Sequence, residues 1–175
     1  MRFYVANAIG IAAVIFFVLS YQQKTRQRIV ACNVISRVLY VLQYILLGAF
    51  EGAVLDILGV MASVAAQQKE RPLLKRHRTT VIAAVNTAII IGGLLVYENG
   101  FSLLPICGVL LHTGAFWLTS ENKIRWISLI GSPFWLVYNL VSRAYGSALG
   151  DAMTIGSIAL ALVRYRKTKD ETIHK

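Results

Sequence analysis

The feature that most constrains this chain is a series of seven long apolar runs separated by short polar breaks. A membrane-spanning helix needs about 20 mainly apolar residues to cross roughly 30 Å of hydrocarbon. Backbone groups in lipid must bond within their own segment, and the alternating pattern of a membrane barrel is absent, so we predict helices. The runs cover residues 3–21, 28–47, 52–67, 78–97, 101–119, 125–143 and 148–165.

Composition supports a membrane protein over a soluble one. Of the 175 residues, 57% are hydrophobic and 15% are charged, whereas a soluble domain carries about 25% charged residues. The seven runs occupy most of the chain and leave no room for a soluble domain. The first run follows Met1-Arg2 without a convincing cleavage site, so we interpret it as an uncleaved span. We therefore predict an all-α integral membrane protein with a single transmembrane domain, residues 1–175.

The basic residues are concentrated in alternate breaks. Of the 18 Lys and Arg, only Arg2, Arg37 and Arg143 lie neither in nor at the edges of the breaks after the first, third and fifth runs and of the tail. Basic loops favour the cytoplasmic side, so we expect the N-terminus outside and the tail 166–175 in the cytoplasm. Anionic lipid headgroups are the expected partner on that side. Because the basic residues do not line one face of a soluble fold, nucleic acid is not expected.

The longest internal break, from Lys69 to Arg78, is interpreted as a solvated loop that sets topology. A regulatory or partner site is the alternative for this segment.

The chain also shows a weak internal repeat. Glycine pairs recur at one fixed spacing: Gly10 with Gly108, Gly48 with Gly146, and Gly52 with Gly150. Spans 1–3 (residues 1–68) and spans 5–7 (residues 101–165) share lengths and basic breaks, and span 4 (residues 78–97) is left as a linker. An odd linker gives both triplets the same orientation, so we predict two parallel three-helix bundles. In transporters built this way, the substrate site lies between the halves near mid-membrane.

The three-plus-one-plus-three order resembles the SWEET sugar-transporter and PQ-loop superfamily. Ser20-Tyr21-Gln22 sits where those families carry a Pro-Gln motif, and the missing proline puts a proline-hinged gate in doubt. The resemblance implies transport, although such a fold does not by itself fix function.

A closer resemblance, to the YgjV-type family of bacterial inner-membrane proteins, covers nearly the whole chain and implies an inner-membrane location. That family supplies no established activity to carry over. The residues that carry it are Leu103-Leu104-Pro105-x-x-Gly108, Trp135-x-x-x-Asn139, Gly146-Ser147 and Arg164-x-Arg166.

Polar residues inside the runs are the candidate site. Asn33, Arg37, Tyr40 and Tyr44 follow the spacing of one helix face, which cannot face lipid cheaply. Arg37 lies near the middle of the second run, and Asp56 lies within reach on the third, so we predict an ion pair. It is either a charged element of a solute path or a structural pair that locks the two helices together.

The second half offers a different set of polar groups. Trp135 and Asn139 lie one turn apart, and together with Tyr138 they suit the recognition of a sugar-like or nucleoside-like ring. Helix packing is the alternative for this group. His112, halfway along the fifth run, is either a proton shuttle or a hydrogen-bonded core residue.

No nucleotide-binding loop, nucleophile elbow or metal-spaced cluster is present, and Cys32 and Cys107 stand far apart in apolar runs. We therefore expect neither an enzyme nor a cofactor or metal. The leading hypothesis is a facilitator of a small polar solute that works by alternating access of the two halves. The rival hypothesis is a non-transporting receptor or scaffold. Whether the protein forms a homo-oligomer is left open by the sequence. The candidate substrate-binding residues are Arg37, Tyr40, Asp56, His112, Trp135, Tyr138 and Asn139.

Overall fold

The computed structural model describes residues 2–48, 50–97, 99–141 and 145–173, and the side chains of these residues except 139, 145–147 and 165–173. Within those ranges the secondary structure is helical and contains no strand. The elements are α1 (Arg2–Gln22), α2 (Arg26–Leu47), α3 (Phe50–Gln67), α4 (Pro72–Arg76), α5 (Arg78–Leu95), the 3-10 turn η1 (Gly100–Ser102), α6 (Leu103–Ala115), α7 (Glu121–Val141) and α8 (Tyr145–Ile173).

The helices depart from the sequence prediction most clearly at three places. The fifth run does not stay helical to residue 119, because α6 ends at Ala115 and residues 116–120 are non-helical. The seventh helix does not end at residue 165, since α8 continues to Ile173 through a charged segment in which Arg, Lys and Glu favour helix. The break between the third and fourth runs contains the short helix α4.

The turns at the helix ends have local causes. Gly48 ends α2 in the left-handed conformation, with φ of 77°, and its amide donates back to the last turn of the helix. Before α6, the Asn99 side chain accepts from the Phe101 amide, and the Ser102 hydroxyl accepts from the Asn99 amide. These groups satisfy backbone donors at the start of the helix.

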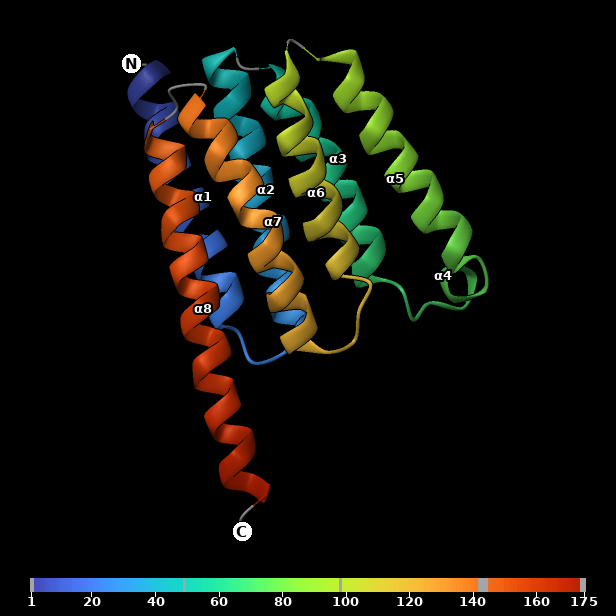
Figure 1. Ribbon diagram of the computed structural model, residues 1–175. Coiled ribbons are helices and arrows are strands. Elements are labelled where there is room, and N and C mark those ends of the chain that lie inside the picture. The colour runs from blue at the N-terminus through green and yellow to red at the C-terminus, as the bar shows by residue number, and fades with distance from the viewer. Residues whose placement is uncertain (1, 49, 98, 142–144, 174–175) are drawn as a thin grey trace.

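The long helices run alternately up and down and form two triplets (Figure 1). Within the first triplet α2 packs between α1 and α3, and within the second α7 packs between α6 and α8. The triplets meet at two seams, where α1 packs against α8 and α3 packs against α6. These contacts close a ring of six helices. α5 lies outside the ring, against α3 and α6.

The breaks that carry most of the basic residues open at one end of the bundle, the lower end in Figure 1. This end, marked by Arg26, Lys69, Arg78 and Arg125, is called the basic end below. A buried apolar cluster that includes Tyr21, Phe116 and Ile124 fills the bundle there. A second cluster, around Leu55, Ile89 and Val109, joins α3, α5 and α6.

The outer surface is apolar along the length of the bundle. Large side chains such as Ile11, Ile130 and Leu160 are exposed there, which lipid permits and water would penalise. Among the described residues, α1, α2, α3 and α5 are long and apolar enough to cross a membrane, and the apolar segment Gly100–Ala115 is shorter. The arrangement of seven crossings in two bundles therefore stays a prediction.

Candidate functional site

The polar face of α2 points into the ring. Arg37 and Asn33 are buried, and the Arg37 Nε donates to Asn33 Oδ1 over 3.0 Å. The Arg37 Nη1 donates to Asp56 Oδ1 on α3 over 2.7 Å, so the predicted ion pair is confirmed. An ionised side chain in lipid needs a partner of this kind, and the pair joins two neighbouring helices of the first triplet.

A glycine makes room for the Arg37 guanidinium. A Cβ on Gly59 of α3 would lie 2.5 Å from Nη1 and 3.0 Å from Cζ of Arg37. The close approach of α3 to the guanidinium therefore depends on the absence of a side chain at this position.

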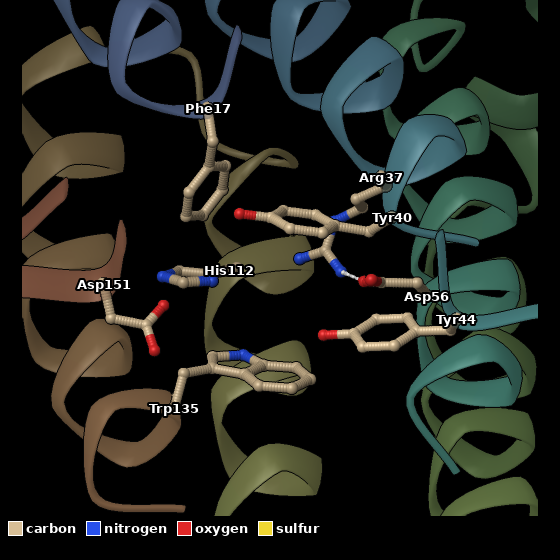
Figure 2. Close-up of a pocket in the computed structure, with 8 residues that line it drawn as sticks. All are labelled: Phe17, Arg37, Tyr40, Tyr44, Asp56, His112, Trp135 and Asp151. Carbon is tan, nitrogen blue, oxygen red and sulfur yellow. Dashed lines mark hydrogen bonds and ion pairs between the residues drawn. The ribbon is translucent and has the colours of Figure 1, made fainter. Parts of the chain in front are cut away.

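A cavity of about 40 Å³ lies inside the ring, beside the ion pair (Figure 2). Each of the six ring helices contributes to its lining, and α5 does not. Four aromatic rings, one imidazole, one guanidinium and two carboxylates surround it. The lining residues are Phe17, Arg37, Tyr40, Tyr44, Asp56, His112, Trp135 and Asp151.

The aromatic rings of the lining have fixed orientations. The Tyr40 and Tyr44 rings are stacked at 6.1 Å with an interplanar angle of 23°. Trp135 faces the cavity from α7 (Figure 2). Its indole packs closely against α6 at Gly108, where an added Cβ would lie 2.6 Å from the Trp135 ring. The cavity thus offers flat apolar faces next to charged groups.

His112 has one ring nitrogen engaged and one without a partner. Its Nε2 lies 3.1 Å from the Ser128 carbonyl and 3.3 Å from the Ser132 hydroxyl. A carbonyl only accepts hydrogen bonds, so Nε2 carries the proton and donates. In the neutral ring Nδ1 is then an acceptor, and it is buried without a hydrogen-bond partner among the described residues.

Five of the seven predicted site residues line the cavity: Arg37, Tyr40, Asp56, His112 and Trp135. Tyr138 does not line it. Its hydroxyl donates to Glu51 Oε2 over 2.7 Å, which turns the side chain toward α3, and its ring contacts Trp135 edge to face. The side chain of Asn139 lies outside the described part of the structure.

Three lining residues were absent from the predicted set. Tyr44 belongs to the polar stripe of α2, so the helical spacing already signalled it. Asp151 lines the cavity from α8, close to the start of that helix. Phe17 is one of many apolar residues in its run, and nothing in the sequence distinguishes it.

A second polar site lies at the basic end, where cationic side chains bind backbone carbonyls. The Lys69 ammonium is buried and donates to the carbonyls of Trp117 and Leu118 over 3.1 and 2.9 Å. Arg78 donates to the Trp117 carbonyl over 2.8 Å. Burial, together with the nearby Arg26 and Arg78 charges, lowers the pKa of Lys69 below its ordinary value.

The interpretation of this break as a solvated loop is therefore wrong for Lys69, whose ammonium binds the chain that follows α6. Exposed basic residues remain in the same break: Arg71, Lys75 and Arg76.

The described residues contain no group of three or more His, Cys, Asp or Glu side chains that could hold a metal ion. Cys107 is exposed on the outer surface and Cys32 is partly exposed, and both are free.

The apolar surface, the helical ring and the buried ion pair define an integral membrane protein. A model of the Imp-YgjV family, described as bacterial inner membrane protein, matches residues 4–169. The chain belongs to this family of the bacterial inner membrane. No curated protein and no solved structure matches the chain.

Proposed function

We propose that this chain crosses the bacterial inner membrane seven times and facilitates the passage of a small polar solute by alternating access of two three-helix halves. The observation that carries the proposal is the cavity lined from all six ring helices. A site built from both triplets changes its exposure whenever the triplets rock against each other. A scaffold would need no such shared cavity.

The packing pattern supports two equivalent halves. If α1, α2 and α3 are matched to α6, α7 and α8, the contact between α1 and α8 corresponds to the contact between α6 and α3. Both contacts are present. α5 packs against α3 and α6 on one side of the ring, as a linker between halves would. Parallel repeats around a midplane site are a recurring transporter design.

Orientation is proposed from the basic end. It would face the cytoplasm by the positive-inside rule, with the N-terminus outside and the C-terminus inside. The helix α4 supports this placement, because Leu73 is 73% exposed beside the exposed Arg71, Lys75 and Arg76. An apolar side chain among cations suits the level of anionic lipid headgroups, which we propose as the partner there.

The cavity volume shows why the halves would have to move. A buried water needs about 10–15 Å³ of such space, so the cavity of about 40 Å³ admits a few waters. Pockets for organic solutes measure about 300–1,000 Å³. The described conformation therefore represents a closed state in this proposal, and the solute enters when one seam widens. No coupling ion is proposed, so passive or exchange transport is favoured.

The alternative is a non-transporting receptor or scaffold. The observation that favours it is the Arg37–Asp56 pair, which already satisfies both charges without a solute. In that case the polar groups would only fix how the six helices pack.

A thermal-shift screen tests the proposal. The purified protein is screened against sugars, nucleosides and vitamins, and a compound that raises the melting temperature is then followed as a radiolabelled solute into proteoliposomes. Trp135→Ala removes one aromatic wall of the cavity. The matched control is Val137→Ala on the same helix, whose side chain is 43% exposed on the outer surface.

We expect stabilisation and uptake in the wild type and in Val137→Ala, and the loss of both in Trp135→Ala. A compound that binds the cavity but never enters the proteoliposomes would favour the receptor. Stabilisation and uptake that both survive Trp135→Ala would place the site elsewhere.

A further inference from the structure

Two arginines at the basic end each reach from one triplet into the other. Arg26, the first residue of α2, donates through Nε to the carbonyls of Phe116 and Leu118, over 3.0 and 2.9 Å. These carbonyls follow the end of α6. Arg26 also binds the Ala66 carbonyl near the end of α3. The Arg26 guanidinium, which belongs to the first triplet, thus binds the segment that follows α6 in the second triplet.

Arg125 makes the reciprocal connection. It lies on the second turn of α7, is only 1% exposed, and donates through Nε to the Tyr21 carbonyl over 3.1 Å. Its Nη2 donates to the Gln23 carbonyl over 2.6 Å. Tyr21 and Gln23 lie at the end of α1, so a guanidinium of the second triplet holds a helix end of the first.

Both arginines meet carbonyls for the same physical reason. The last carbonyls of a helix have no partner within the helix, and they form the negative end of its dipole. A guanidinium placed there supplies charged donors, which bind more strongly than neutral ones. Lys69 and Arg78 add further bonds to the carbonyls of Trp117 and Leu118.

A different contact joins the triplets at the opposite end. There the Tyr138 hydroxyl on α7 donates to Glu51 on α3. The Arg2 bond to the Ile45 carbonyl stays within the first triplet.

Between the cavity and the arginines lies a seam of buried polar atoms that have no close hydrogen-bond partner among the described residues. They come from both triplets: Tyr21 Oη and Asn33 Nδ2 from the first, His112 Nδ1 and Ser128 Oγ from the second. The hydroxyls of Tyr21 and Ser128 lie close to each other across the two triplets. Unpaired polar groups destabilise a buried interface, and water would satisfy them if the halves separated.

We propose that Arg26 and Arg125 form the gate at the basic end, and that the polar seam above them becomes the hydrated path when the gate opens. The arginines hold the helix ends together in the closed state, whereas the unpaired groups favour opening. This inference rests on the proposed function for what passes through, but the gate itself is testable without a solute.

Thiol labelling of the membrane-embedded protein tests the gate. In a background with Cys32→Ser and Cys107→Ser, Ser128→Cys places a thiol in the seam. The reporter control, Ile130→Cys, lies on the same helix at a position 58% exposed on the outer surface. Reconstituted in nanodiscs, each protein is treated with a small cationic methanethiosulfonate, and the labelling rate is measured by mass spectrometry.

The gate is opened by Arg26→Gln or Arg125→Gln. The charge control is Lys123→Gln, which removes an exposed cation two residues from Arg125. Arg125 is fully buried, so Arg125→Lys, which retains one charged donor, replaces the glutamine variant if the latter is not monodisperse. Arg26 is half-buried and gives an independent second variant.

We expect slow labelling of Ser128→Cys with the gate intact and a rate about tenfold higher or more in either arginine variant, since each charge-assisted bond that is lost shifts the equilibrium toward opening. Lys123→Gln should leave the rate unchanged, and Ile130→Cys should not respond to the arginines. Equal rates in all variants, or fast labelling with the gate intact, would overturn the proposal. Faster labelling without solute uptake in any assay would retain the gate and reject transport.

Discussion

The buried pair of Arg37 and Asp56 provides the sharpest test of how this bundle is held together. The two side chains are 4% and 6% exposed, and their charged atoms lie 2.7 Å apart. We expect Asp56→Leu to leave a buried guanidinium whose remaining partner is Asn33, and Arg37→Met to leave a buried carboxylate. The double variant has neither charge.

The magnitudes follow from desolvation. Removing one partner of a buried ion pair costs about 3–5 kcal/mol, whereas replacing both with apolar residues is often near neutral. The double variant still leaves Asn33 without its bond, which costs about 1–3 kcal/mol. We therefore expect the loss of unfolding free energy in the double variant to be smaller, by at least about 3 kcal/mol, than the sum of the losses in the two single variants.

Reversible unfolding in mixed micelles, followed by tryptophan fluorescence while the SDS fraction is raised, measures these free energies. Val38→Met is the matched control, because Val38 follows Arg37 on the same helix and is exposed to lipid. Additive single effects would refute the reasoning, since they would mean that the two charges do not depend on each other. If Arg37→Met folds and a transport assay is unchanged, the pair is structural only.

Two further predictions use the same stability assay. Gly59→Ala should displace the Arg37 guanidinium, because the new Cβ would lie 2.5 Å from Nη1, and it should destabilise by about 1–3 kcal/mol, as overpacking does. Gly156→Ala, a helical glycine with open space around it, should instead be neutral or stabilise by up to about 1 kcal/mol; equal losses at both positions would contradict the close approach. Tyr138→Phe should lose the bond to Glu51 and about 1 kcal/mol, and an unchanged stability would show that this contact does not join the triplets.

Much of the fold could be predicted from local pattern. The apolar runs gave helices because the backbone in lipid has few other ways to satisfy its hydrogen bonds. The polar face of α2 could be predicted to point inward, because residues spaced by three and four share one side of a helix. The Arg37–Asp56 pair followed because a charge in lipid requires a partner, and Asp56 was the carboxylate within reach.

The rest of the site depended on contacts that local pattern does not encode. Asp151 and Phe17 line the cavity because α8 and α1 pack against each other, and that seam joins the two ends of the chain. Tyr138 shares a face with the predicted site, but a bond to Glu51 on α3 draws its hydroxyl away. Contacts between helices that are distant in the sequence decided each of these outcomes.

The sequence by itself determined the solvent of this protein, the helical character of its runs and the burial of its polar stripe, because each follows from the cost of placing polar groups in hydrocarbon. Tertiary structure alone decided what the basic residues do. Arg26 and Arg125 read as topology signals in the chain, yet they bind helix ends about 90 to 104 residues away. Every residue has a backbone carbonyl, so the sequence does not mark which carbonyls these arginines bind. Only the folded arrangement of the helices brings donor and acceptor together.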